Sequence, residues 1–81
     1  MVDVVYTEKF EQAFKKIDHS VKQKAIKQIK KIIEHPEIGK LLKYNLQGER
    51  TMYVKPFRII YSFLNDTIYF LRFEHRGSVY D

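Results

Sequence analysis

The last third of the chain holds three β-rich segments separated by two-residue turns, and this pattern limits the possible folds more than any other feature. The segments cover residues 49–55, 57–64 and 67–74, with turns at Lys55-Pro56 and Asn65-Asp66. Turns this short join neighbouring antiparallel strands. The sequence therefore predicts a three-stranded antiparallel meander at the C-terminal end.

The first 33 residues predict one strand followed by two helices. Residues 2–6 are β-branched and aromatic, and Thr7 follows them as an N-cap candidate. The next segment has apolar residues at helical spacing, namely Phe10, Ala13, Phe14 and Ile17. Residues 21–33 repeat this spacing, and Ser20 is positioned to cap them. A helix pair with a tight connection follows.

These elements predict one α+β domain over residues 1–81, because a chain of 81 residues is about half the usual domain length. We expect an N-terminal strand and a two-helix antiparallel hairpin on one face of a small, mainly antiparallel sheet.

The side chains of the predicted strands alternate between two faces of this sheet. In residues 57–63, Phe57 and Ile59 should face one way and Arg58 and Ile60 the other. In the next strand, alternation predicts that Tyr69, Leu71 and Phe73 share a face. The two helices can cover only one of the two faces.

The charge of the chain favours an anionic partner. Fifteen Lys and Arg residues against ten Asp and Glu give a net charge of +5. The second predicted helix carries Lys22, Lys24, Lys27, Lys30 and Lys31 before its first acidic residue, Glu34. This set is either a solvated helix face or a surface for RNA or an acidic protein, with Lys27 and Lys31 as candidate phosphate contacts.

Several classes of protein lose support from what the sequence lacks. No apolar run approaches the roughly 20 residues of a membrane-spanning helix, and the N-terminus lacks a signal-peptide pattern, so we expect a cytoplasmic protein without a membrane partner. The chain has no cysteine, no P-loop, no glycine-rich dinucleotide turn and no His-Glu-x-x-His motif. We expect neither a metal nor a cofactor.

The remaining candidates for chemistry lie in the strands and the C-terminal tail. They are Arg50, Lys55, Arg58, His75, Arg76 and Tyr80. Arg58 is the most informative, because a guanidinium between Phe57 and Ile59 loses hydration unless it faces an open groove or meets an anion. A binding role and a structural ion pair both satisfy this requirement.

The residues considered so far resemble the RelE/ParE superfamily, the small toxins of type II toxin–antitoxin systems, over nearly the whole chain. The similar features are Val5-Tyr6-Thr7 with Phe10 and Phe14, a lysine-rich helix ending in His35-Pro36, the segment 39–48, the strand around Phe57-Arg58-Ile59-Ile60-Tyr61, and the closing His75-Arg76 with Val79-Tyr80.

The resemblance implies a toxin that is held inactive by a small acidic antitoxin similar to RelB. Within the superfamily, the RelE branch cleaves mRNA on the ribosome and the ParE branch inhibits DNA gyrase. For RNA cleavage, the 2′-hydroxyl attacks the adjacent phosphate without a metal. Arg58 and Arg76 suit stabilisation of the phosphoryl charge, with Arg50 and Lys55 adding to the field.

Two further positions match the family pattern, and one departs from it. Tyr80 corresponds to the C-terminal tyrosine near the nucleophile, and His75 titrates close enough to neutrality to act as acid or base. The second strand has Thr51, Met52 and Tyr53 where active relatives tend to carry closely spaced lysines. The general base is therefore open.

Three functions stay in view: an endoribonuclease acting on ribosome-bound mRNA, a gyrase inhibitor, and a basic binding domain without catalysis. The first is preferred, because the arginines and the His-Arg, Val-Tyr ending suit phosphodiester chemistry.

Overall fold

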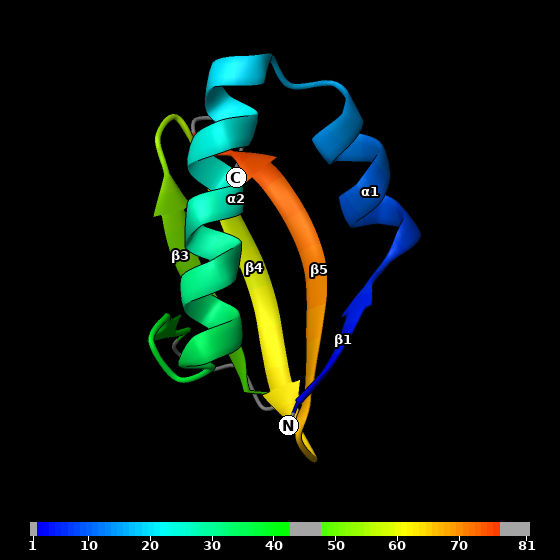
Figure 1. Cartoon of the computed structure of the whole chain (residues 1–81), viewed down its shortest axis with the longest axis vertical. Coiled ribbons are helices and arrows are strands. Elements are labelled where there is room, and N and C mark those ends of the chain that lie inside the picture. The colour runs from blue at the N-terminus through cyan, green and yellow to red at the C-terminus, as the bar shows by residue number, and fades with distance from the viewer. Residues whose placement is uncertain (1, 43–47, 77–81) are drawn as a thin grey trace.

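A computed structural model describes residues 2–42 and 48–76, and it places two helices on one face of a five-stranded sheet (Figure 1). The elements in chain order are β1 (Asp3–Tyr6), α1 (Glu8–Lys15), α2 (His19–Glu34), β2 (Lys40–Leu41), β3 (Glu49–Val54), β4 (Phe57–Leu64) and β5 (Thr67–His75). The strand order is β1-β5-β4-β3-β2. Strand β1 pairs parallel with β5, and the other pairs are antiparallel. The predicted α+β fold and the C-terminal meander are confirmed.

The helix starts are set by side-chain caps, one of which differs from the prediction. The Thr7 hydroxyl accepts a hydrogen bond from the Phe10 amide at 3.2 Å, as expected of an N-cap. Helix α2 is capped by Asp18, not Ser20: an Asp18 carboxylate oxygen accepts from the Val21 amide at 3.0 Å. The Ser20 hydroxyl donates to the same carboxylate at 2.9 Å. The charged acceptor two residues earlier makes the stronger cap and starts the helix at His19.

The core lies between the helices and the sheet and is rich in aromatic rings. Phe10 of α1 is 2% exposed, and its ring lies 5.5 Å from Phe70 and 5.9 Å from Phe73, both on β5. Helix α2 contributes Ala25, Ile29 and Ile32. Contacts of this kind add about 0.5–1.5 kcal/mol per ring pair beyond area burial.

An irregularity in β5 changes the expected alternation of side chains. Ile60 pairs with Arg72 but the next residue, Tyr61, pairs with Phe70, so Leu71 is an extra residue in the ladder. Before this bulge, Ile68 and Phe70 face the core; after it, Phe73 does. The prediction that Tyr69, Leu71 and Phe73 share one face is therefore wrong. The bulge instead places Tyr69 on the same side as Arg72.

One buried tyrosine ties the end of α2 to the middle of the sheet. The Tyr61 hydroxyl donates to the Pro36 carbonyl at 2.7 Å and accepts from the Gly39 amide at 2.9 Å. A Cβ at position 39 would lie 2.7 Å from this hydroxyl oxygen and 3.0 Å from the Thr51 carbonyl oxygen. The close approach of loop and ring therefore requires glycine at this position.

None of the helices among the described residues has the length and apolar character needed to cross a membrane.

Candidate functional site on the sheet face opposite the helices

The face of the sheet opposite α1 and α2, called the arginine face below, carries the polar side chains of three neighbouring strands. Because Ile59 and Tyr61 of β4 belong to the core, Arg58 and Ile60 project from the other face. The ladder pairs Arg58 with Tyr53 of β3 and with Glu74 of β5. A row of three polar side chains therefore crosses the sheet at this level.

Arg76 joins this row through an aromatic contact. Its guanidinium carbon lies 5.0 Å from the centre of the Tyr53 ring, and its amide donates to the Pro56 carbonyl at 2.8 Å. The second bond holds the chain after β5 beside the β3–β4 turn, which also contains the exposed Lys55. Of the two arginines predicted to bind phosphate, Arg76 thus contacts the Tyr53 ring and Arg58 is the cross-strand neighbour of Tyr53. Lys55 belongs to the same end of the sheet.

A chain of ion pairs runs along the arginine face. Arg72 contacts Glu49 at 3.4 Å and Glu74 at 3.1 Å, and Glu74 contacts Arg58 at 3.5 Å. Arg58 therefore does meet an internal carboxylate, through the longest of the three contacts. Three arginines against two glutamates leave an excess of one positive charge when Arg76 is included.

Two polar atoms in this region lack a hydrogen-bond partner among the described residues although they are buried. They are the Nε of Arg58 and the hydroxyl oxygen of Thr51. A buried donor without a partner carries a free-energy cost of about 1–3 kcal/mol. The Arg58 guanidinium is thus only partly satisfied by Glu74, and it retains donors for an anionic ligand.

Arg50 and His75 are not brought to the arginine face. Arg50 pairs with Tyr61, whose side chain is in the core, and its guanidinium donates to the backbone carbonyls of Gly39 at 2.9 Å and Glu37 at 3.2 Å. These bonds hold the loop after α2. His75 pairs with Phe57 on the helix side, where the two rings make an edge contact at 5.2 Å. The alternation that directs Glu74 to the arginine face directs His75 to the opposite face.

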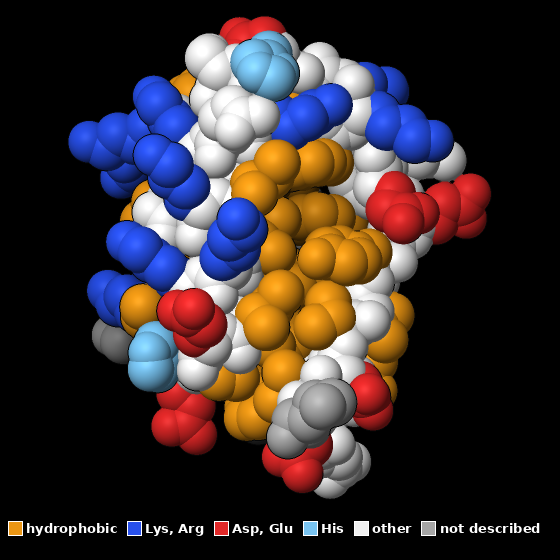
Figure 2. Space-filling view, in the orientation of Figure 1, with side chains coloured by type: hydrophobic (Ala, Val, Ile, Leu, Met, Phe, Trp, Pro, Cys, Tyr) orange, Lys and Arg blue, Asp and Glu red, His pale blue; other side chains and the backbone are white. Residues whose placement is uncertain are grey.

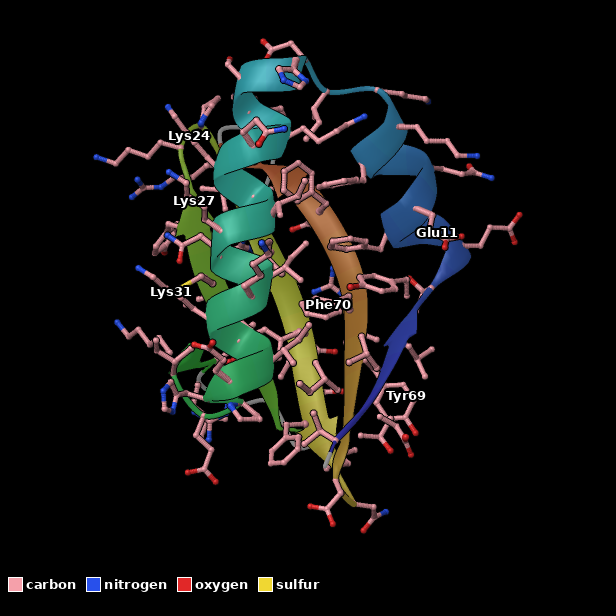
Figure 3. All side chains as sticks on the ribbon, in the orientation of Figure 1. Glu11, Lys24, Lys27, Lys31, Tyr69 and Phe70 are labelled. Atoms are coloured by element: carbon pink, nitrogen blue, oxygen red, sulfur yellow. The ribbon has the colours of Figure 1, made fainter. Side chains whose placement is uncertain are left out.

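The lysines of α2 do not form one ridge. Lys22 lies 5.5 Å from the centre of the Phe14 ring, and Lys30 lines a groove between the helices. Lys24, Lys27 and Lys31 project from the other side of α2, toward the β3 edge of the molecule (Figure 3). Lys27 and Lys31, predicted as phosphate contacts, are exposed there, away from Arg58.

Tyr80, the remaining predicted site residue, lies outside the described residues. Tyr53, Arg72 and Glu74 lie on the arginine face and were not predicted from the sequence as site residues. Strand register would have found Tyr53, because the two-residue turn after Val54 sets it opposite Arg58. Placing Arg72 and Glu74 on this face required knowledge of the bulge at Leu71, which shifts the register of β5.

A second feature, an apolar groove of about 630 Å³, lies between α1 and α2 on the helix side. Figure 2 shows hydrophobic side chains filling this hollow, with charged residues along its margins. Its walls are formed by Tyr6, Phe10, Phe14, Ile26, Ile29 and Ile33, with Glu11, Lys15 and Lys30. Phe70 points toward the same space (Figure 3).

Over residues 2–42 and 48–76, His, Asp and Glu side chains form no group of three or more that could bind a metal ion. The chemistry available on the arginine face comes from guanidinium, carboxylate and phenol groups. Fixed guanidinium donors stabilise negative charge on phosphoryl oxygens, and an exposed aromatic ring stacks on a base.

Solved structures with a similar fold include toxins. The isolated E. coli RelE toxin superposes with a TM-score of 0.81 at 11% identity, covering 93% of this chain and 84% of that chain. RelE in the archaeal RelE–RelB complex from Pyrococcus horikoshii OT3 gives 0.79 at 15% identity, covering 96% and 98%. The YoeB dimer from Staphylococcus aureus gives 0.75 at 18% identity, covering 91% and 95%. At these identities the likeness establishes the fold alone.

Sequence comparison gives the family. None of the curated proteins is significantly similar to the chain. A family profile described as "ParE toxin of type II toxin-antitoxin system, parDE" matches residues 4–80, which include all the arginines of the site. The chain therefore belongs to the ParE toxin family of type II toxin–antitoxin systems.

Proposed function

We propose that the protein is an endoribonuclease that inhibits translation by cleaving ribosome-bound mRNA in the cytoplasm. The observation that carries the proposal is the grouping of Arg58, Tyr53 and Arg76 on the arginine face. An exposed aromatic ring with one guanidinium over it and a second on its cross-strand neighbour suits a phosphodiester flanked by a stacked base.

The proposed reaction transfers a phosphoryl group from the 5′-oxygen of one nucleotide to the 2′-oxygen of the preceding one. The 2′-oxygen attacks the adjacent phosphorus and the bond to the 5′-oxygen breaks, which leaves a 2′,3′-cyclic phosphate and a 5′-hydroxyl end. Arg58 and Arg76 oppose the negative charge that develops on the phosphoryl oxygens. Tyr53 positions the base, and the ribosome supplies the remaining orientation of the strand.

Primer extension on mRNA in a translation reaction tests this proposal. The wild type should produce new breaks within codons, and Arg58→Ala or Arg76→Ala should remove them. Lys9→Ala, which deletes an exposed positive charge on α1, is the matched control and should cut like the wild type. Intact message at a toxin concentration that stops translation would reject the proposal.

A second candidate, inhibition of DNA gyrase, is favoured by the family profile, which is that of ParE. It requires contact with the enzyme and no cleavage of RNA. Accumulation of gyrase-linked DNA breaks, together with undamaged mRNA, would identify this activity.

We further propose that a small acidic antitoxin binds the groove between α1 and α2. RelE from P. horikoshii was solved in complex with RelB. The apolar walls of the groove suit one face of an amphipathic helix, and Lys15 and Lys30 suit acidic residues beside that face. Lys30→Glu should weaken binding of the cognate antitoxin, measured by calorimetry. Lys24→Glu, on the other side of α2, should not; equal losses would place the antitoxin elsewhere.

A further inference from the structure

The position of Glu74 points to the missing proton acceptor of the site. Of the carboxylates in the described part of the chain, Glu74 is the one that contacts Arg58, at 3.5 Å. Its side chain is 28% exposed on the arginine face, in the same row as Tyr53. His75, the sequence-based candidate for acid or base, leaves β5 on the opposite face. We propose that Glu74 is the general base that removes the proton from the attacking 2′-hydroxyl, an inference that rests on the proposed ribonuclease function.

The two carboxylate oxygens of Glu74 contact different arginines. One oxygen is held by the Nε of Arg72 at 3.1 Å, and Arg72 is itself held by Glu49 at 3.4 Å. Arg72 is therefore a positioning residue, which fixes the orientation of the carboxylate. Among the described residues, the other oxygen contacts Arg58 alone, at 3.5 Å, which is the long end of hydrogen-bond geometry.

The weaker contact is the one that a substrate would replace. A phosphate oxygen competes well for the Arg58 guanidinium, because the contact with Glu74 is long and the Arg58 side chain is 20% exposed. Once Arg58 turns to the phosphate, the freed Glu74 oxygen lies beside the group that must lose a proton. Charge favours this exchange, because three arginines, Arg58, Arg72 and Arg76, share this part of the sheet with two glutamates.

The proton balance of the step is complete without a further reagent. The 2′-hydroxyl proton moves to Glu74 as the bond from the 2′-oxygen to phosphorus forms. The bond from phosphorus to the 5′-oxygen breaks, and the leaving oxygen takes a proton from water. Glu74 then returns its proton to solvent, so that the enzyme is regenerated in its starting form.

The experiment compares two isosteric variants that remove the same charge from the ion-pair chain. Glu74→Gln should lower the single-turnover rate of mRNA cleavage on ribosome complexes by at least about 100-fold, the usual contribution of a general base. Glu49→Gln, which contacts the far end of Arg72, should lower it by only a few fold. Binding of both variants to a ribosome complex carrying a 2′-deoxy mRNA should be no weaker than that of the wild type, so that a lower rate cannot be traced to lost binding.

Rescue separates catalysis from a structural role. Glu74→Ala should regain activity when acetate is added, because a free carboxylate can occupy the vacated position. Formate, the weaker base, should rescue less. A counter-ion that only restrains Arg58 predicts the reverse: Glu74→Gln would bind RNA more tightly and cleave as fast as the wild type.

Three results would overturn the inference while leaving the ribonuclease function in place: a Glu74→Gln rate within threefold of the wild type, equal losses in Glu74→Gln and Glu49→Gln, or no rescue by acetate. Intact mRNA with the wild type itself would instead remove both proposals.

Discussion

The guanidinium of Arg76 lies over the ring of Tyr53, with 5.0 Å between its central carbon and the ring centre. The contact links the residue after β5 to the end of β3, across the strand that carries Arg58. Tyr53 is 45% exposed, so its ring is available to a ligand as well as to Arg76. Tyr53 is also the cross-strand partner of Arg58, so this one residue neighbours both arginines of the proposed site.

This arrangement predicts the effect of two substitutions at position 53. Tyr53→Leu removes both the support for Arg76 and the stacking surface, and the cleavage rate should fall by about 10-fold or more, in line with about 1–3 kcal/mol for a stacked base. Tyr53→Phe keeps the ring and should stay within about threefold. Single-turnover cleavage measures both. A Phe variant as slow as the Leu variant would show that the phenol, and not the ring, is what the site needs.

Arg50 should matter for stability instead of cleavage. Its guanidinium satisfies the carbonyls of Gly39 and Glu37 and lies on the helix side of β3. Arg50→Ala should lower the free energy of unfolding by about 1–3 kcal/mol, because these acceptors lose a charged donor. Denaturant unfolding gives this value, and primer extension should show cleavage like that of the wild type. Loss of cleavage without loss of stability would return Arg50 to the site.

Tyr61 should give the fold a dependence on alkaline pH. Burial raises the pKa of the Tyr61 phenol above its ordinary value of 10.0, and this effect outweighs the hydrogen bond from Gly39, which lowers it. The unfolded chain therefore loses this proton first. The stability that the neutral phenol contributes is complete below pH 10 and declines as the pH rises further.

Denaturant unfolding of Tyr61→Phe tests this effect. At pH 8 the variant should be less stable by about 1–3 kcal/mol, because the Pro36 carbonyl and the Gly39 amide lose their partner. Between pH 10 and 11.5 the gap between variant and wild type should narrow. A gap that stays constant over this range would show that Tyr61 does not titrate differently in the two states.

Two substitutions test whether Asp18 or Ser20 caps α2. Asp18→Ala should destabilise the protein more than Ser20→Ala, because Asp18 accepts the Val21 amide and Ser20 only supports it. Two hydrogen bonds to the carboxylate, from Val21 and Ser20, lower the pKa of Asp18. The difference between the variants should therefore be present at neutral pH and disappear as the pH falls through the acid range. Thermal unfolding at pH 7 and pH 3 measures it; a larger loss in Ser20→Ala would contradict this assignment.

Much of the architecture could be predicted from the sequence because spacing and turn length determine it. The periodicity of Phe10 and Phe14 gave α1, and the short turn at Asn65-Asp66 gave the β4–β5 hairpin. The alternation in β4 correctly separated Arg58 from Ile59. These are local properties, which neighbouring residues decide.

The make-up of the site was harder to predict because it depends on contacts between strands. Nothing near Leu71 marks a bulge, since the segment contains neither Gly nor Pro. Without the bulge, Glu74 and Arg72 could not be placed opposite Arg58 and Ile60. His75 was an attractive candidate because an imidazole can act as acid or base, and only the pairing with Phe57 revealed the direction of its side chain.

The bulge at Leu71 has a consequence for how such a protein is inactivated. Deleting Leu71 would leave a regular ladder in which Arg72 still pairs with Ile60 and Phe73 with Ile59, so every later side chain of β5 would keep its face. One residue inserted after the bulge would instead turn Phe73 outward and force Arg72 and Glu74 beneath the helices. A single added codon, with each reactive group still encoded, would thus replace a charged surface by an apolar one. Screens for harmless natural versions of this toxin should look for altered spacing as well as for altered residues.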